Sequence, residues 1–149
     1  MKEMSDIFFE PADLSDSNGI NELFRESVDK YEDAETISFD EIYAWFDRKL
    51  QKHVRDFERI RSDGRLCGYI YIHEYEDGLE LDDFYLLKEY RGRGIGTKVL
   101  SARISTLEVP VYLYVFKRNE AAFHLYRKFG FEVIKDLGTR FIMKRSVGK

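Results

Sequence analysis

Residues 79–107, which read LELDDFYLLKEYRGRGIGTKVLSARISTL, predict a strand, a glycine-rich turn and a helix in succession. The strand carries an apolar run that ends at Leu87. After the turn, apolar residues return at helical spacing, at Ile95, Val99, Leu100, Ala102, Ile104 and Leu107. Glycines 92, 94 and 96 let a ligand approach the backbone, and the first N–H groups of a helix are unpaired and carry the positive end of its dipole. The stretch therefore predicts an anion site, whose usual occupant is phosphate.

The glycine spacing alone does not identify the ligand. Its order is G-x-G-x-G, whereas dinucleotide-binding turns use G-x-G-x-x-G. Nucleotide-binding phosphate loops place Lys directly before Ser or Thr, but here Lys98 follows Thr97. A flexible turn without a ligand is therefore an alternative on this evidence.

Two motifs, taken together, are far more specific than the glycines. Arg91, Gly94 and Gly96 fit the pattern Gln/Arg-x-x-Gly-x-Gly/Ala. Further along, residues 119–131, which read NEAAFHLYRKFGF, fit Asn-x-x-Ala-x-x-x-Tyr-x-x-x-Gly-Phe. In this order and separation the motifs resemble those of the GNAT superfamily of N-acetyltransferases. The resemblance covers residues 66–144 well and the first fifty residues loosely.

This resemblance implies that acetyl-CoA is the co-substrate and that its pyrophosphate lies on the glycine-rich loop. Arg91 and Arg93 suit the pyrophosphate or the 3′-phosphate, and Asn119 suits the pantetheine arm or the start of its helix. Backbone N–H groups near Leu86 and Leu87 would polarise the thioester carbonyl, a role taken from the family. The cofactor contacts implied are Leu86, Leu87, Arg91, Gly92, Arg93, Gly94, Ile95, Gly96, Thr97 and Asn119.

Apolar periodicity and turn signals predict the remaining elements. Strands are expected at about 7–10, 54–61, 66–73, 79–87, 111–115, 131–136 and 139–144, and helices from a cap at Asp16 or Ser17, over 39–52, 95–107 and 120–129. The pairs Asp63–Gly64 and Asp77–Gly78 indicate hairpin turns. We therefore expect an α/β fold of the mixed α+β type with three layers. Its central sheet is mixed and mostly antiparallel, with about seven strands flanked by about four helices, which is the GNAT arrangement.

Two further expectations concern burial. The helix over 39–52 carries a stripe expected to be buried, formed by Ile42, Trp45, Phe46 and Leu50. The run Val111–Val115 is continuously apolar, which is typical of a strand that is covered on both faces.

Length and composition indicate one compact domain over residues 1–149. The chain has a mass of 17.7 kDa and contains 44% hydrophobic and 15% aromatic residues, enough for a full core. We expect no secretory leader and no membrane span, since no segment approaches roughly 20 apolar residues. Cys67 has no cysteine partner, so a reducing cytoplasm is the expected location.

Charge is divided between the two parts of the chain. Residues 1–83 contain 10 Lys and Arg against 23 Asp and Glu, a net charge of −13, whereas residues 84–149 contain 14 against 5, a net charge of +9. This division suits a protein that holds a polyanionic cofactor beside a cationic amine. The alternative is two solvated faces that happen to segregate. No nucleic-acid partner is expected, because the basic residues form no dense patch.

Three acids in the strand before the loop, Glu80, Asp82 and Asp83, are the candidates for chemistry. A central strand of a covered sheet is usually apolar, and burial raises the pKa of a carboxyl toward the range useful for a base. Strand alternation places Glu80 and Asp82 on one side and Asp83 on the other. The family resemblance places its glutamate base at Glu80 and, in the polyamine branch, substrate contacts at Asp82 and Asp83. The alternative is that these acids lie in water at the open end of the strand.

The implied reaction is a direct attack by a primary amine on the thioester within a ternary complex. An alkylamine with a pKa near 10.4 is only about one part in a thousand neutral at pH 7, so a base is useful. Glu80 would take the proton directly or through a water, with Asp82 as the alternate. The expected acceptor is a cationic small molecule, a polyamine or a peptide amine, and the loop that begins at Tyr31 is expected to help bind it.

Tyr126 occupies the place of the family tyrosine that donates a proton or a hydrogen bond to the departing CoA sulfur. With pKa values of about 8.5 for a thiol and 10 for tyrosine, complete transfer is uphill, so a hydrogen bond serves at least as well. The alternative is that Tyr126 belongs to the core, because it lies on the apolar stripe of its helix.

The remaining reactive residues carry weaker signals. His53, His73 and His124 are isolated in the sequence and lack ligand spacing, so no metal is expected. An acetyl-CoA-binding or sensing module with little turnover is the alternative function. The identity of the acceptor and a homodimeric state are left open.

Overall fold

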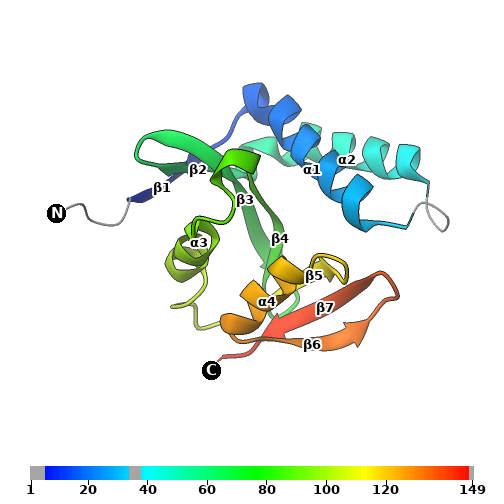
Figure 1. The fold of residues 1–149 in the computed structure, drawn as a ribbon, viewed down its shortest axis with the longest axis vertical. Coiled ribbons are helices and arrows are strands. Elements are labelled where there is room, and N and C mark those ends of the chain that lie inside the picture. The colour runs from blue at the N-terminus through cyan, green and yellow to red at the C-terminus, as the bar shows by residue number, and fades with distance from the viewer. Residues whose placement is uncertain (1–5, 34–37, 148–149) are drawn as a thin grey trace.

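The structure, a computed structural model, describes residues 6–33 and 38–147. Its elements are β1 (Ile7–Pro11), α1 (Ser17–Tyr31), α2 (Phe39–His53), β2 (Glu58–Ser62), β3 (Arg65–Tyr75), β4 (Gly78–Leu86), α3 (Ile95–Arg103), β5 (Val111–Phe116), α4 (Glu120–Lys128), β6 (Phe131–Asp136) and β7 (Arg140–Arg145). Within these described ranges, the order of strands and helices is the predicted one (Figure 1).

The strands form one sheet in the order β1-β2-β3-β4-β5-β7-β6. All neighbouring strands are antiparallel except β4 and β5, which run parallel. The β2–β3 hairpin turns at Asp63 and Gly64, which both have positive φ, at 54° and 78°. Positive φ at both central residues is the backbone geometry that suits the right-handed twist of a two-residue hairpin. The predicted mixed, mostly antiparallel sheet is confirmed.

Helices cover both faces of the sheet, which gives three layers. Side chains of β3 alternate between two hydrophobic clusters: Tyr69 and Tyr71 pack with α1 and α2, whereas Ile70 packs with α3 and α4. In Figure 1, α1 and α2 lie next to each other at one end of the molecule, and α3 lies well apart from them. The period of two along the strand therefore decides which helices each residue meets.

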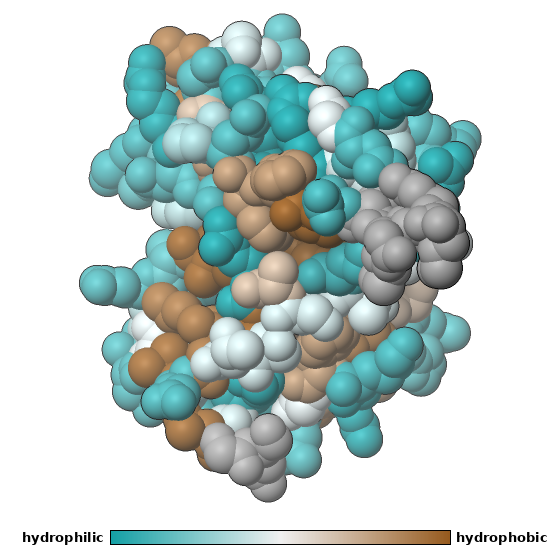
Figure 2. All heavy atoms as spheres, turned by 90° about the vertical axis from the view of Figure 1, so that its left-hand side faces the viewer, coloured by the Kyte–Doolittle hydropathy of each residue, from teal (hydrophilic) through white to brown (hydrophobic). Residues whose placement is uncertain are grey.

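The surface beside β1 and α3 is not uniformly polar. Figure 2, which turns the left-hand side of Figure 1 toward the viewer, shows apolar side chains gathered at the centre of this face and toward its lower left, with hydrophilic side chains over most of its upper part. Phe8 of β1 and Val109, which follows α3, are among the large apolar residues with substantial exposure, at 58% and 39%. Scattered exposed apolar residues are normal, so this face alone assigns no function.

The sheet opens between β4 and β5. Among the described residues these strands pair at two positions, Leu79 with Val111 and Glu80 with Tyr112. Gly78 is needed just before this junction, because a Cβ there would lie 2.0 Å from the carbonyl oxygen of Pro110. Beyond the two pairs the strands separate and leave room for a cleft between them.

Two predicted element boundaries are wrong. The strand expected at 54–61 begins at Glu58, because Val54–Asp56 forms a short 3₁₀ helix that extends α2. Helix α3 ends at Arg103, short of Leu107. There the Ser105 carbonyl oxygen accepts a hydrogen bond of 2.9 Å from the Arg145 guanidinium of β7. The two residues are 40 positions apart in the sequence, so the apolar periodicity of the helix could not indicate this contact.

Two predictions of burial are also wrong. Trp45 is 50% exposed, because its side chain lines the cleft between β4 and β5. Tyr114 of β5 is 39% exposed, while Val111, Leu113 and Val115 are buried. The face of β5 that carries Tyr114 is less covered than the opposite face, because the cluster of α1 and α2 packs on β3, and from α1 Tyr31 contacts Phe116 at the end of β5.

Candidate active site

The opening between β4 and β5 contains two adjoining cavities of about 520 and 490 Å³. The first is bordered by the acids of β4, by α2 and by β5, and the second by α1 and the glycine-rich loop. Six residues line both cavities: Ser27, Phe84, Tyr85, Asn119, Ala122 and Tyr126. The two spaces are therefore parts of one cleft, and Tyr126 and Asn119 lie where they meet.

A bulge in β4 shapes the acidic end of the cleft. Tyr71 of β3 pairs with Asp83, but the next residue, Ile72, pairs with Leu81, so Asp82 is an extra residue without a partner in β3. The bulge breaks strict alternation. The prediction that Asp82 and Asp83 lie on opposite sides is therefore wrong, because both carboxylates reach the same ammonium group.

That ammonium group belongs to Lys49 of α2. Its Nζ lies 2.6 Å from Asp83 Oδ2 and 3.0 Å from Asp82 Oδ2. The rings of Trp45 and Tyr71 stand 5.3 and 5.6 Å from it, within the range of cation–π attraction. Burial alone would lower the pKa of Lys49, but the two carboxylates outweigh burial and raise it. Lys49 is therefore charged and already neutralises the acids predicted to bind substrate, a partner that the sequence reasoning missed.

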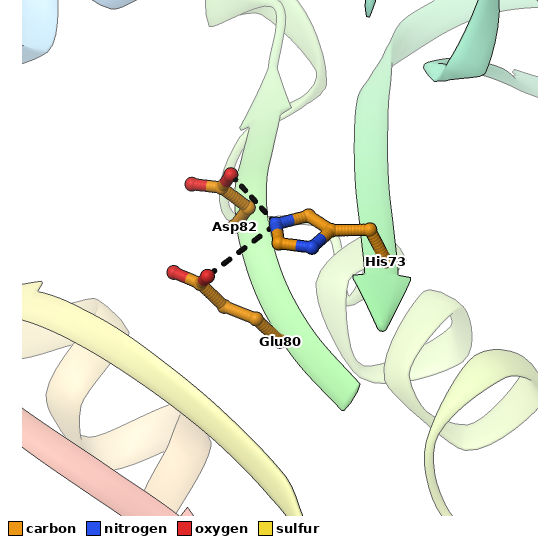
Figure 3. A group of neighbouring side chains, drawn as sticks. All are labelled: His73, Glu80 and Asp82. Atoms are coloured by element: carbon orange, nitrogen blue, oxygen red, sulfur yellow. Dashed lines mark hydrogen bonds and ion pairs between the residues drawn. The ribbon is translucent and has the colours of Figure 1, made fainter. Parts of the chain in front are cut away.

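Glu80 lies on the same strand and meets His73 of β3 (Figure 3). One ring nitrogen of His73, Nε2, faces Glu80 Oε1 at 3.3 Å and Asp82 Oδ2 at 2.9 Å. Burial, followed by repulsion from Asp82, raises the pKa of Glu80 to about 7. The alternative that the acids lie in water is not supported, since Glu80 and Asp83 are buried.

His73 is isolated in the sequence but not in the fold. His73 and Glu80 are direct neighbours across β3 and β4, a relationship that depends on strand register. The facing atoms of His73, Glu80 and Asp82 lie within 4.8 Å of one another, a spacing that a metal ion could bridge. The same Asp82 oxygen is 3.0 Å from the Lys49 ammonium, so an added cation would meet a strong repulsion. We assign no metal to this group, and its absence stays a prediction.

The second cavity is bounded by the glycine-rich loop. Gly92 and Gly94 have φ of 75° and 80°, a conformation that favours glycine, and Gly94 is the N-cap of α3. A Cβ at Gly96 would lie 3.2 Å from Leu125 of α4, so glycine there permits close helix packing. Gly92, Gly94, Gly96 and Thr97 all line the cavity, next to the N-terminus of α3.

Residues 20–131 match the model of the acetyltransferase (GNAT) family, which is three quarters of the chain. The chain belongs to the GNAT family. Over 57 residues it is 39% identical to the spermine/spermidine N(1)-acetyltransferase of Bacillus subtilis, a match that covers 35% of this chain and 38% of the relative. Over 103 residues it is 31% identical to the spermidine N(1)-acetyltransferase of Escherichia coli, covering 62% of this chain and 55% of the relative. The chain thus spans about half or less of the length of these relatives.

A solved structure of a GNAT relative is similar to almost the whole of this chain. The PaiA N-acetyltransferase from Thermoplasma acidophilum, crystallised in complex with coenzyme A, has a TM-score of 0.72 and 25% sequence identity. The match covers 95% of this chain and 99% of that one. The predicted family and its three-layer fold are therefore confirmed.

The cofactor residues implied by the GNAT resemblance divide into two groups. Leu86, Arg91 and the loop residues named above border the second cavity, as does Asn119, whose Oδ1 accepts a hydrogen bond of 3.2 Å from the Ala122 N–H. Arg93 and Ile95 lie elsewhere: Ile95 is buried in the core, and Arg93 stacks on Tyr90 beside a separate cavity of about 390 Å³.

The carbonyl-polarising role expected of Leu87 is wrong. Its N–H donates a hydrogen bond of 2.7 Å to the Cys67 carbonyl oxygen, so this donor is already used by the sheet. Leu86 lines the second cavity, and its carbonyl oxygen accepts a hydrogen bond of 2.9 Å from Arg91 Nε.

Tyr31 and Tyr126 both lie in the cleft. Tyr31 borders the loop-side cavity and stacks on Phe116, with 6.0 Å between ring centroids, instead of lying beside the acids. The end of its expected loop, Ala34 and Glu35, is outside the described residues. Tyr126 is buried and packs edge-on against Phe131, so it belongs to the core as well as to the cleft wall. Burial raises the pKa of its hydroxyl.

Over the ranges that the structure describes, none of the helices combines the length and the apolar character that crossing a membrane requires.

Proposed function

We propose that this GNAT protein transfers the acetyl group of acetyl-CoA to a primary amine by direct attack within a ternary complex. The observation that carries the proposal is the position of Glu80, a buried carboxylate with a pKa of about 7 at the acidic end of a two-part cleft. The other part of the cleft is bordered by the glycine-rich loop, and Tyr126 stands between the two parts.

The loop side of the cleft suits the pyrophosphate of acetyl-CoA. Gly92 and Gly94 expose backbone to the cavity, and the first N–H groups of α3 offer unpaired donors at the positive end of its dipole. Asn119 and Tyr126 are then placed along the path from the loop to the acids. The coenzyme A complex of the Thermoplasma relative supports this assignment.

The acidic side of the cleft suits a cationic amine. Three carboxylates, those of Glu80, Asp82 and Asp83, meet two cations, Lys49 and protonated His73, which leaves one negative charge when all are ionised. Glu80 removes the proton that blocks attack, because an ammonium nitrogen has no free electron pair. The names of the polyamine acetyltransferases from B. subtilis and E. coli are consistent with a cationic acceptor.

Tyr126 completes the proposed reaction at the leaving group. The amine nitrogen forms a bond to the acetyl carbon, the carbon–sulfur bond breaks, and the sulfur leaves as a thiolate. Because burial raises the pKa of Tyr126, its hydroxyl keeps its proton and stabilises the thiolate by a hydrogen bond.

The test is release of free CoA thiol from acetyl-CoA, screened across polyamines, aminoglycosides, amino acids and basic peptides. Turnover with one class of amine, reduced at least about tenfold in Glu80→Gln and in Tyr126→Phe, would support the proposal. Glu132→Gln is the matched control, since Glu132 is exposed on β6. Tight binding of acetyl-CoA without turnover by any amine would instead favour a binding or sensing module.

A further inference from the structure

Arg140, the first residue of β7, is a cation that borders the first cavity, and no described residue pairs with it. Its Nε is buried and has no hydrogen-bond partner. Within residues 6–33 and 38–147, the guanidinium forms no hydrogen bond or ion pair at all. A guanidinium carries five N–H donors, and a buried donor without an acceptor is costly. An anion that enters the cavity can therefore satisfy Arg140.

Two tyrosines add donors beside the guanidinium. The guanidinium carbon of Arg140 lies 5.6 Å from the centre of the Tyr114 ring, within the range of cation–π attraction. The Tyr114 hydroxyl is 3.4 Å from the hydroxyl of Tyr75, and both residues border the first cavity. Two hydroxyls have two hydrogens and share one hydrogen bond, so one O–H group can still donate. Arg140 and the tyrosine pair therefore offer donors to the same cavity.

The carboxylates of the first cavity are engaged elsewhere. The three acids of β4 meet the Lys49 ammonium and the His73 ring. Glu32 also borders the cavity, and its carboxylate accepts a hydrogen bond of 3.2 Å from the Asp33 N–H. Since Lys49 is itself held by two carboxylates, Arg140 is the cation in the described wall of this cavity that can bind an anion from solution.

Strand pairing separates Arg140 from the proposed base. Glu80 pairs with Tyr112 of β5, near one end of the strand. Arg140 pairs with Phe116 at the other end and reaches back over Tyr114. The two residues from Tyr112 to Tyr114 span roughly 7 Å of strand. An acceptor in the cavity therefore meets a carboxylate at one end and a guanidinium several ångströms away.

We infer that Arg140 binds a carboxylate of the acceptor, so that the amine substrate is an amino acid or a similar zwitterion. The ammonium group of such an acceptor faces Glu80, and its carboxylate can accept two parallel N–H bonds from the guanidinium. One guanidinium balances one negative charge, which favours a carboxylate over a phosphate group that carries more than one. The inference deepens the proposed function and rests on it.

The state of the acids agrees with a single ammonium group on the acceptor. Lys49 already lies between Asp82 and Asp83, at 3.0 and 2.6 Å, where a second ammonium group of a polyamine would otherwise bind. The group of three acids and two cations keeps one negative charge when all are ionised. That charge matches one ammonium group, and Arg140 matches one carboxylate.

The test compares acceptors that differ by one carboxylate, with the full chain in the thiol-release assay. Each amino acid in the screen is paired with the amine that lacks its carboxylate, such as glycine with methylamine, β-alanine with ethylamine and phenylalanine with phenethylamine. Aminomethylphosphonate is compared with glycine. Arg140→Gln removes the charge, and Arg118→Gln, at an exposed position after β5, is the matched control.

We expect kcat/KM of the unmodified protein to be at least about tenfold higher for the amino acid of the best pair than for its amine, because the ionic hydrogen bonds are made only by the carboxylate. Arg140→Gln should remove most of this difference by raising the KM of the amino acid. The kcat/KM of the matching amine and the KM of acetyl-CoA should hardly change, since Arg140 does not border the second cavity. Arg118→Gln should keep the preference.

Equal kcat/KM within every pair, a preference for the amines, or an equal loss for both members of a pair in Arg140→Gln would overturn the inference. A preference for aminomethylphosphonate over glycine would overturn the carboxylate in favour of a phosphate group. If Arg140→Gln does not fold, the paired acceptors still decide the question in the unmodified protein. Failure of that protein to turn over any amine would refute the proposed function instead.

Discussion

The guanidinium group of Arg91 is held by the carboxylate of Glu26 through two hydrogen bonds of 3.1 and 2.9 Å. Its Nε also donates to the Leu86 carbonyl oxygen, so three of its donors are in use. Arg91 precedes the glycine-rich loop and Glu26 lies on α1, so the pair joins a helix to the loop across the second cavity. A pyrophosphate that binds Arg91 must compete with this carboxylate.

We expect Glu26→Gln to tighten binding of coenzyme A about threefold, since the competing charge is removed. The effect is small because both side chains are nearly half exposed, and exposed ion pairs contribute about 1 kcal/mol or less. Calorimetric titration with coenzyme A would measure it. Glu22→Gln removes an exposed charge from the same helix and serves as the control. Weaker binding by Glu26→Gln would show that the pair positions Arg91 for the phosphate.

The rate of acetyl transfer should rise with pH through about 7, because Glu80 acts only when ionised and its pKa is raised to about 7. The rate measured between pH 5.5 and 8.5 at saturating acetyl-CoA tests this. In Glu80→Gln the rise near pH 7 should disappear along with most of the activity. A wild-type rate that is flat between pH 6 and pH 8 would exclude Glu80 as the base.

The same pKa predicts an effect on stability. Since the folded pKa of Glu80 lies above its unfolded value, protonation favours the folded state, and this contribution is lost as pH rises through about 7. Glu80→Gln should therefore be more stable than the wild type at pH 8, by about 1–3 kcal/mol, and about equal to it at pH 5. Urea unfolding at both pH values measures the difference. Equal stability of Glu80→Gln and the wild type at pH 8 would contradict the raised pKa of Glu80 and its cause, the burial of its carboxylate.

Replacement of Lys49 should destabilise the fold. Lys49→Met leaves Asp82 and Asp83 side by side without their cation, at a cost of about 3 kcal/mol when one partner of a buried pair is removed. If the variant folds, we expect its acceptor preference to move from monoamines toward diamines, because a second ammonium group can occupy the vacated site. Urea unfolding and relative kcat/KM values for butylamine and diaminobutane would test both statements. Lys52→Met, at an exposed position of the same helix, is the control.

Asp16, directly before α1, links the start of this helix to the sheet through hydrogen bonds from Arg59 of β2 and Tyr69 of β3. Burial alone would raise the pKa of Asp16, but hydrogen bonds from Arg59, the Asp13 N–H and Tyr69 outweigh burial and lower it. The stability it contributes is present above its unfolded pKa and is lost as pH falls through its folded pKa. We expect Asp16→Asn to cost about 2 kcal/mol at pH 7 and less at pH 3 in urea unfolding. An undiminished cost at pH 3 would mean that packing, and not charge, is responsible.

Local patterns were sufficient to predict the order of the elements. The Asp63–Gly64 turn has the positive φ values that its sequence predicts, and Ser38 starts α2 by accepting a hydrogen bond of 3.3 Å from the Glu41 N–H. Asp16 stands at the N-cap position of α1, but its side chain makes no capping bond and binds Arg59 instead. The competing partner is 43 residues away, beyond the reach of a local rule.

The acidic site was predictable in its location and not in its connections. Strand alternation cannot reveal an inserted residue, so the bulge at Asp82 and its consequence for Asp83 were missed. Lys49 is 34 residues from Asp83, and His73 meets Glu80 only through strand register. The roles of Glu80, Tyr126 and the loop residues stay predictions until the variants are measured.

The two residue pairs between β4 and β5 have a mechanical consequence. Among the described residues, they join the two parts of the seven-stranded sheet, β1–β4 and β5–β7, at one end of the cleft near Glu80. A ligand whose amide groups bond to the facing edges of β4 and β5 would act as the missing strand and hold the two parts together. Binding should therefore slow amide hydrogen exchange along β4 and β5 together, including at residues that the ligand does not touch.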